Sequence, residues 1–464
     1  SALAEENSSV NICGATWSTS TYAKTVNGQV VTEGASAEDY NLYWDAATAT
    51  LTLQNADMKV ENIGAISAEV DLLTINLIGE NVISAENSQT DVDYAAISNS
   101  KQIAITGADT TASLTVTVDQ TAALSSASSV AGISAGSGLT NSATINLEVK
   151  AATDVDYGDD LYGLKSGVSA AQPGFLDNNG NITAVIRNDG LDSFYGTNSY
   201  AIFIYGGAMD NSGTLDMTVS TINGDAYGLR GTSTTELWNN NGTIISDVTA
   251  YGGNYEGVDE QLYKASNDAC AVSVVTSSAN GLEMQNSGVM ELYAVNYGRN
   301  TYYEYAIGLE LDSNATVFTN SGTMDIKALE AYTWGIYLSN LTDDATLTNS
   351  GNITIEATTN GKMCLLNDPY SYSVATGIGI NMTNYDANPN PVRTRMILES
   401  GSRLDVSTKA ADNVNGAITA PSGIEPWDQP SVALVLGLYW YACKLFPNAV
   451  SVDEATQKAI NFYA

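Results

Sequence analysis

The sequence predicts an all-β fold, a single-stranded parallel β-helix (β-solenoid) with about three strands in each coil. Three observations lead to this prediction. A turn of Asn, Ser and Gly recurs along the chain, a small residue followed by an aliphatic one recurs out of phase with it, and runs of alternating apolar and polar residues lie between the two. Stacked repeats account for all three, because every coil has to turn at the same places.

The turn element sets the period. From Gly213 to Gly242, and again from Gly322 to Gly351, the step is 29 residues, and insertions lengthen the other steps. Glycine at the corner is expected to supply a left-handed backbone conformation. Asparagine is expected to stack on its equivalent in the next coil. The turns are Asn178-Asn179-Gly180, Asn211-Ser212-Gly213, Asn240-Asn241-Gly242, Asn286-Ser287-Gly288, Asn320-Ser321-Gly322 and Asn349-Ser350-Gly351, with the variants Asn141-Ser142-Ala143 and Glu399-Ser400-Gly401.

The second element has a similar period. Its aliphatic residue recurs after 31 residues from Ile66 to Ile97, and after 27 from Ile202 to Leu229. Two independent markers with one period strengthen the repeat interpretation. The element reads Gly64-Ala65-Ile66, Ala95-Ala96-Ile97, Ala131-Gly132-Ile133, Tyr162-Gly163-Leu164, Tyr200-Ala201-Ile202, Tyr227-Gly228-Leu229, Ile307-Gly308-Leu309, Trp334-Gly335-Ile336, Thr376-Gly377-Ile378 and Gly416-Ala417-Ile418.

One coil is expected to contain three short strands. In the most regular repeat these are Thr214–Val219, Ala226–Arg230 and Thr234–Trp238, each with alternating residues and separated by Gly, Asn or Ser. Each strand would pair with its counterpart one coil away, at about 4.8 Å. A right-handed coil is expected from the general preference for right-handed parallel crossovers.

The chain divides into three predicted parts. Residues 1–44 form an N-terminal cap, residues 45–420 form the solenoid, and residues 421–464 form a C-terminal cap or docking segment, with an apolar stretch at Ser431–Phe446 and a predicted helix at Asp453–Asn461. A solenoid must cover its last coil, because an open β edge pairs with other strands. A separate N-terminal sandwich ending near Gln120 is the alternative for the first third.

Charge excludes several classes of function. Lys and Arg total 17 against 52 Asp and Glu, the formal net charge is −35, the isoelectric point is about 4.1, and histidine is absent. Nucleic acid and anionic membrane surfaces need a basic face, so neither is expected as a partner. Mechanisms that depend on histidine are excluded. No apolar run reaches the length of a membrane helix, and no membrane insertion is expected.

No enzymatic activity is expected. Parallel β-helices include polysaccharide lyases and hydrolases that work with paired carboxylates, but this chain lacks the Gly-His-Gly and Arg-x-Lys motifs of pectin hydrolases. The densest acidic run contains Asp154, Asp156, Asp159 and Asp160. Alternating carboxylates are also suited to Ca²⁺, so this run is the candidate metal site, with an ordinary acidic turn as the alternative. No other cofactor is expected.

The cysteines are Cys13, Cys270, Cys364 and Cys443. A disulfide requires Cα atoms within about 7 Å. In a solenoid Cys270 and Cys364 are some three coils apart, and Cys13 and Cys443 lie at opposite ends. All four are therefore candidates for disulfides between molecules, and four buried free thiols are the alternative.

Aromatic residues gather on neighbouring coils. The candidate contact strip consists of Tyr302, Tyr303, Tyr305, Tyr332, Trp334 and Tyr337. Such a strip on a rigid surface suits stacking against a glycan or against another copy of the chain, and filling of an enlarged coil is an equal alternative.

The first residues, Ser1-Ala2-Leu3-Ala4, have the small side chains found near a signal-peptidase site, which predicts an exported, extracellular protein with a cleaved signal peptide. With its Asn-Ser-Gly turns and Tyr-Gly-aliphatic repeats, the chain resembles bacterial and archaeal surface β-solenoids: adhesin and autotransporter-passenger repeats, and sheath or surface-layer subunits. By composition it is similar to the amyloid-like sheath proteins of methanogenic archaea.

This resemblance implies a structural subunit of an extracellular polymer, a sheath, surface layer or filament, whose partner is the chain itself. Backbone strand pairing, and disulfides through Cys13 and Cys443, would hold the subunits together. A glycan-binding adhesin is the second hypothesis, and a carboxylate-based polysaccharide lyase or hydrolase is the third.

Overall fold

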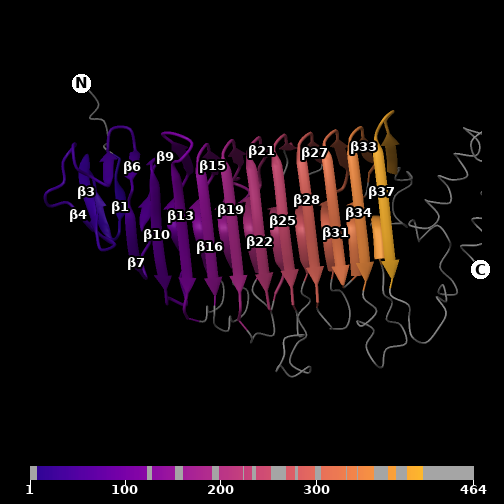
Figure 1. Cartoon of the computed structure of the whole chain (residues 1–464), viewed down its shortest axis with the longest axis horizontal. Helices are drawn as coiled ribbons and strands as arrows, with labels where there is room; N and C mark the ends of the chain where they lie inside the picture. The colour runs from indigo at the N-terminus through magenta and orange to yellow at the C-terminus, as the bar shows by residue number, and fades with distance from the viewer. Residues whose placement is uncertain are drawn as a thin grey trace, which may run out of the picture.

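A computed structural model of the chain describes residues 8–122, 128–151, 160–190, 198–222, 224–232, 237–251, 268–276, 281–297, 305–330, 332–341, 343–359, 375–382 and 394–410. Within these ranges all regular secondary structure is β, and none is helical. The strands form three long sheets of 12, 11 and 14 strands (Figure 1). The predicted all-β parallel β-helix is thereby confirmed.

Each sheet collects one strand from every coil. The 12-stranded sheet has the order β2 (Ala15–Trp17), β1 (Val10–Ile12), β8 (Ile66–Ala68), β11 (Tyr94–Asn99), β14 (Ser129–Ala135), β17 (Asp160–Ser166), β20 (Asn198–Tyr205), β23 (Ala226–Thr232), β26 (Ala269–Val275), β29 (Tyr305–Asp312), β32 (Tyr332–Leu341) and β35 (Ala375–Met382). The 11-stranded sheet has the order β37 (Arg403–Ala410), β34 (Asn352–Thr359), β31 (Thr323–Glu330), β28 (Val289–Asn296), β25 (Thr243–Ala250), β22 (Thr214–Thr221), β19 (Asn181–Asn188), β16 (Thr144–Ala151), β13 (Ser113–Gln120), β10 (Glu80–Asn87) and β7 (Asp57–Glu61).

The 14-stranded sheet has the order β36 (Thr394–Leu398), β33 (Ala345–Asn349), β30 (Thr316–Asn320), β27 (Leu282–Asn286), β24 (Trp238–Asn240), β21 (Met209–Asn211), β18 (Leu176–Asn178), β15 (Gly138–Asn141), β12 (Gln102–Gly107), β9 (Leu72–Ile78), β6 (Thr50–Gln54), β5 (Leu42–Asp45), β3 (Thr21–Val26) and β4 (Gln29–Val31). A typical coil runs β20, β21, β22, and the next copy of each strand pairs with it in parallel register.

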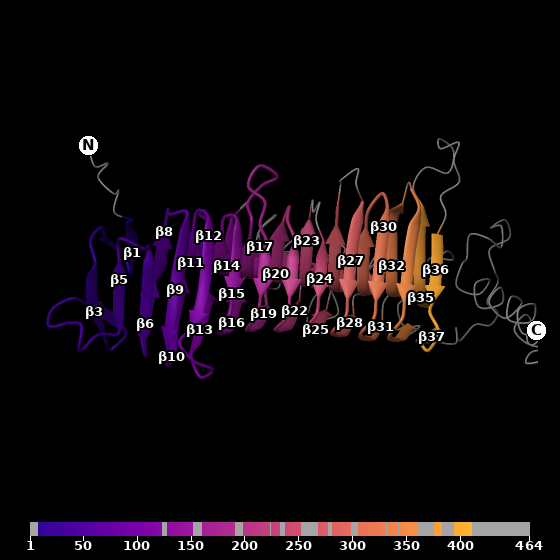
Figure 2. The ribbon, with the colours of Figure 1, turned by 90° about the horizontal axis from the view of Figure 1, so that it is seen from above.

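The N-terminal end differs from the rest. β1 pairs antiparallel with β2 and β8, and β3, β4, β5 and β6 also pair antiparallel. Parallel pairing begins with β6 on β9 and β7 on β10. The strands that follow, up to β16, belong to the same continuous sheets as the rest of the rod, without the break that a separate sandwich would require (Figure 2). Residues 421–464, the predicted C-terminal segment, lie outside the described residues.

Inward-facing side chains stack into apolar columns along the rod. One column runs in register through the 11-stranded sheet and is buried throughout: Leu114, Ile145, Ile182, Leu215, Ile244, Met290, Met324 and Ile353. Burial of each such side chain contributes about 1.5–3 kcal/mol relative to exposure. These columns form one core that continues from coil to coil.

An asparagine ladder runs beside this core, as the turn element predicts. The first asparagine of each turn ends a strand of the 14-stranded sheet and is at most 2% exposed. From Asn141 to Asn320, each Nδ2 donates to the Oδ1 of the next coil at 2.7–2.8 Å, so every inner rung both donates and accepts. The rungs are Asn141, Asn178, Asn211, Asn240, Asn286, Asn320 and Asn349.

The left-handed backbone conformation predicted for the turn glycines is wrong for most of them. Gly401 has φ +87°, but Gly180, Gly213 and Gly242 do not have positive φ, nor do the later turn glycines up to Gly351. Glycine is required there by the preceding coil. A Cβ on Gly213 would lie 1.9 Å from the carbonyl oxygen of Gly180, and a Cβ on Gly242 would lie 2.1 Å from that of Gly213.

The predicted third strand of the coil, Thr234–Trp238, begins later where the structure describes it. Residues 234–236 lie outside the described residues, Leu237 is not in a strand, and β24 begins at Trp238. Trp238 is fully buried and donates its Nε1–H to the carbonyl oxygen of Gly207 at 3.1 Å. Trp238 and Asn240 are the two buried residues of this three-residue strand.

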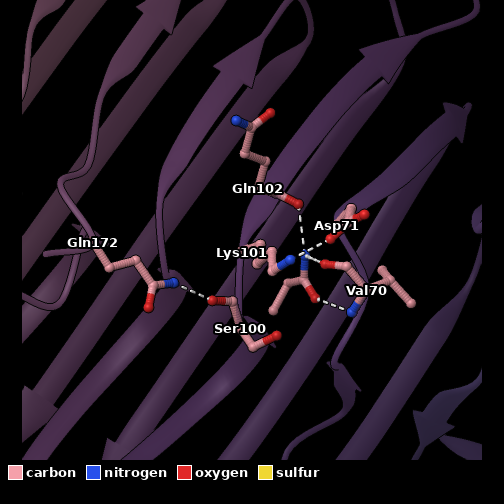
Figure 3. Close-up of polar contacts among 7 residues, drawn as sticks. Val70, Asp71, Ser100, Lys101, Gln102 and Gln172 are labelled. Atoms are coloured by element: carbon pink, nitrogen blue, oxygen red, sulfur yellow. Dashed lines mark hydrogen bonds and ion pairs between the residues drawn. The ribbon is translucent and has the colours of Figure 1, made fainter.

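Polar side chains also stabilise the turn between the 12- and 14-stranded sheets. Asn99 donates to the carbonyl oxygens of Val70 and Gln102 and accepts the N–H of Val70. Figure 3 shows Lys101 beside Asp71 one coil away, with which it forms an ion pair, and Gln172 reaching the carbonyl oxygen of Ser100. Neighbouring coils are thus tied by side chains as well as by the backbone.

Candidate functional site

Insertions concentrate at one corner of the coil. The turn from the 14-stranded to the 11-stranded sheet is short and regular, as between Asn211 and Thr214. The connection from the 11-stranded to the 12-stranded sheet varies widely, from Ala331 alone to residues 251–268. We call this corner the variable edge. In solenoids, insertions on one face often mark the binding face.

A stack of tyrosines lies on the outer side of the 12-stranded sheet. The rings of Tyr162 and Tyr200 are 5.1 Å apart with an interplanar angle of 11°, and those of Tyr200 and Tyr227 are 5.2 Å apart, also at 11°. The three side chains pack with Ala131, Cys270 and Ile307 in a cluster separate from the main core. We call these six residues the outer cluster.

The small residue after each tyrosine explains this placement. Gly163, Ala201 and Gly228 are skipped in the ladder pairing, which resumes at the following aliphatic residue. A Cβ on Gly163 would lie 2.6 Å from the carbonyl oxygen of Ala201. The skip leaves the tyrosine outside the core and the aliphatic residue inside it. The second sequence element therefore determines which side chains lie on the outer face of the sheet, as well as the length of the repeat.

Residues three positions after each tyrosine cover the rings. Lys165 Nζ lies 4.8 Å from the ring centroid of Tyr162, and the guanidinium of Arg230 lies 4.0 Å from that of Tyr227. Phe203 lies 5.1 Å from the ring of Tyr200. A cation over an aromatic face contributes about 0.5–2 kcal/mol, more as water is excluded.

Carboxylates line the start of the same strands. Tyr162 donates its hydroxyl to Asp160 at 2.6 Å, and Tyr227 donates to Asp225 at 3.2 Å. Asp225 also accepts the backbone N–H of Asp268 at 2.9 Å, one coil further on. Asp160 and Asp225 are therefore held by their own strands and by their neighbours, which fits a structural role.

A third carboxylate lies further along the face. Ser273 donates its hydroxyl to Glu310 at 2.6 Å. Burial raises the pKa of Glu310, and burial also raises the pKa of Asp160 and of Asp225, although hydrogen bonds and Arg230 oppose the effect. Desolvation favours the neutral acid in each case.

These raised pKa values predict a protein that is more stable in acid than at neutral pH. A raised folded-state pKa means that the folded chain binds protons more tightly, so the stabilisation is complete below the ordinary pKa of about 4 and is lost as pH rises through the raised values. A tenfold difference in proton affinity between the folded and unfolded chains corresponds to about 1.4 kcal/mol. Thermal unfolding measured from pH 4 to pH 8 should give a falling melting temperature, and the Asp160→Asn/Asp225→Asn double variant should flatten that slope. An unchanged slope would contradict the assignment.

The predicted Ca²⁺ site is described only at Asp160, since Asp154, Asp156 and Asp159 lie outside the described residues. Asp160 is hydrogen-bonded to Tyr162. Among the residues that the structure describes, no group of three or more Cys, Asp or Glu side chains is arranged to hold a metal ion.

Four residues of the predicted aromatic strip are described, and they lie together. Tyr305 and Tyr332 have ring centroids 6.1 Å apart, and Trp334 and Tyr337 have centroids 4.6 Å apart. Tyr305, Trp334 and Tyr337 pack against the outer cluster, so they continue the face that holds Tyr162. Tyr302 and Tyr303 lie outside the described residues. Tyr162, Tyr200 and Tyr227 were not among the predicted site residues; the signal for them was tyrosine in the first position of the second element.

Two cysteines are described, and both are free thiols. Cys13 lies in the turn between β1 and β2 and is half-buried, and burial raises its pKa to about 11. Cys270 is fully buried in the outer cluster, where no second molecule can reach its sulfur. Cys364 and Cys443 lie outside the described residues.

Cys13 is expected to react slowly in the native protein. At pH 8 a thiol with a pKa near 11 is ionised roughly two orders of magnitude less than an ordinary cysteine of pKa about 8.5. Alkylation by iodoacetamide, followed by peptide mapping, should show this delay at Cys13 and a longer one at Cys270. Both differences should vanish in urea at about 8 M, and fast native labelling of Cys13 would refute the expectation.

Comparison with protein-family models, curated proteins and solved structures finds no match to this chain. The described ranges hold no helix long and apolar enough to cross a membrane.

Proposed function

We propose that the protein is a structural subunit of an extracellular, self-assembling polymer such as a sheath, surface layer or filament. The observation that carries this proposal is the difference between the two ends of the rod. The N-terminal end carries short antiparallel strands, whereas the last described coil, β35 to β37, has inward-facing side chains that none of the described residues covers.

Val406 lies in this last described coil. It pairs in register with Ile355, which is 1% exposed, yet Val406 itself is 44% exposed. Leu398 follows Asn349 in the asparagine ladder column and is 46% exposed. An uncovered sheet edge with apolar side chains recruits further strands. A second copy of the chain is the partner that self-assembly requires.

The rest of the molecule supports a mechanical role. In-register ladders with buried amide stacks resist unfolding and proteolysis. The net charge of −35 keeps free subunits apart, and divalent cations or salt would relieve that repulsion during assembly. A disulfide from Cys13 to Cys443 of a neighbour would lock contacts after they form.

The test uses electron microscopy and sedimentation of the full chain over a range of protein, salt and Ca²⁺ concentrations, with and without reductant. Polymers are expected to grow with concentration and salt. Val406→Lys should prevent them. Val317→Lys is the matched control, because Val317 is 46% exposed on β30, a strand that is paired on both sides, with β27 and with β33. A protein that stays monomeric in every condition would overturn the proposal.

A further inference from the structure

We propose that the outer face of the 11-stranded sheet carries a binding site for a neutral polysaccharide, built around Tyr251, Tyr293 and Tyr297. This inference does not depend on self-assembly. The outer cluster lies on the 12-stranded sheet, on one side of the variable edge. The site proposed here lies on the 11-stranded sheet, on the other side of that edge, where β25 and β28 end.

Two of these tyrosines form an exposed, ordered pair. The N–H of Tyr251 bonds to the carbonyl oxygen of Thr221 at 2.9 Å, and that of Tyr297 bonds to Ala250 at 2.8 Å, so both continue the ladder beyond their strands. Their rings are stacked 5.7 Å apart at 16°. Tyr251 is 39% exposed and Tyr297 is 41% exposed. A stacked pair fixed by backbone bonds loses little freedom when it binds a ligand.

The third tyrosine and a valine complete an apolar surface. Along β28, Leu292 and Ala294 face the core, so Tyr293, Val295 and Tyr297 face outward. Val295 is only 3% exposed although it lies on the outward side of the strand. Tyr293, Val295 and Tyr297 thus form one row of largely apolar side chains on the outward side of β28 and just beyond its end.

Charged groups surround this surface. Tyr293 is in register with Asp247 on one side and Lys327 on the other, and Glu356 follows Lys327. Burial raises the pKa of Tyr293 and of Tyr297, and the negative charge of Glu330 raises both further. Three carboxylates against one ammonium leave the rim acidic.

This combination favours sugar units without charge. A sugar ring has a face of C–H groups, which suits an aromatic surface, and a rim of hydroxyls, which donate hydrogen bonds to carboxylates. Binding sites generally combine an apolar base with a few placed polar groups in this way. The acidic rim repels acidic polysaccharides, and on a chain of net charge −35 it also disfavours a second copy of the protein. The spacing of adjacent coils, about 4.8 Å, is close to the length of one pyranose unit.

The experiment is affinity electrophoresis of the full chain in gels containing dextran, mannan, a soluble β-glucan or polygalacturonate, followed by calorimetry with whichever neutral polysaccharide retards it. We expect retardation by at least one neutral polysaccharide and none by polygalacturonate. Tyr297→Ala should weaken binding about tenfold or more, whereas Tyr297→Phe should retain most of it. Tyr22→Ala is the matched control, because Tyr22 stacks on Tyr43 at 4.3 Å in the N-terminal cap.

Three results would overturn the inference. One is no retardation by any of the neutral polysaccharides, and another is equal retardation by polygalacturonate. The third is unchanged affinity in a folded Tyr251→Ala/Tyr297→Ala variant. If that variant loses self-association while the parent binds no polysaccharide, the surface belongs to a contact between copies.

Discussion

Replacing Gly213 by alanine is expected to destabilise the protein by about 3 kcal/mol or more. The new Cβ would lie 1.9 Å from the carbonyl oxygen of Gly180, 2.8 Å from its carbonyl carbon and 2.9 Å from its nitrogen. All three atoms are backbone, and the N–H of Thr214 bonds to that same oxygen at 2.9 Å. Relief of the clash therefore requires two coils to separate where their ladder is continuous.

Urea and thermal denaturation, followed by circular dichroism, measure this effect. Gly34→Ala is the control, since nothing lies within 4 Å of its Cβ and the cost is only that of φ +70°, about 1 kcal/mol. Hydrogen exchange should locate the weakened region at β21 and β22. Equal losses in the two variants would show that the column of turn glycines is not set by contact between coils.

Replacing Asn240 by alanine is expected to cost about 3 kcal/mol. Asn240 accepts from Asn211 at 2.7 Å and donates to Asn286 at 2.8 Å, and all three side chains are fully buried or nearly so. Removing the rung leaves a buried donor on one side and a buried acceptor on the other. Each orphaned group carries its own desolvation cost of about 1–3 kcal/mol.

The neighbouring residue supplies the control for this second prediction. Asn239 lies on the outward side of β24 and donates to Asp210 at 3.2 Å. Asn239→Ala should cost less than about 0.5 kcal/mol, because water replaces its partner. The denaturation midpoints of the two variants give the two losses in the free energy of unfolding. A small loss for Asn240→Ala would mean that the ladder contributes little to stability.

Much of the solenoid follows from local pattern. The period, the parallel stacking and the asparagine ladder could be predicted because each depends on residues that recur at fixed positions, such as Asn211 and Asn240. Four of the six aromatic residues of the predicted strip, from Tyr305 to Tyr337, lie close together, and their use as a contact surface stays a prediction. The antiparallel pairing of β3 to β6 could not be predicted, because no repeat marks it.

The sequence by itself determined which residues are equivalent from coil to coil, since a recurring turn and an alternating strand need only local chemistry. Only the tertiary structure decided what those equivalent residues touch. Gly213 is glycine because of Gly180 in the preceding coil, Tyr200 lies outside the core because Ala201 is skipped in the ladder, and Val406 is exposed because no described coil covers it. Each of these depends on contacts between coils, far apart in the chain, which no short stretch of sequence contains.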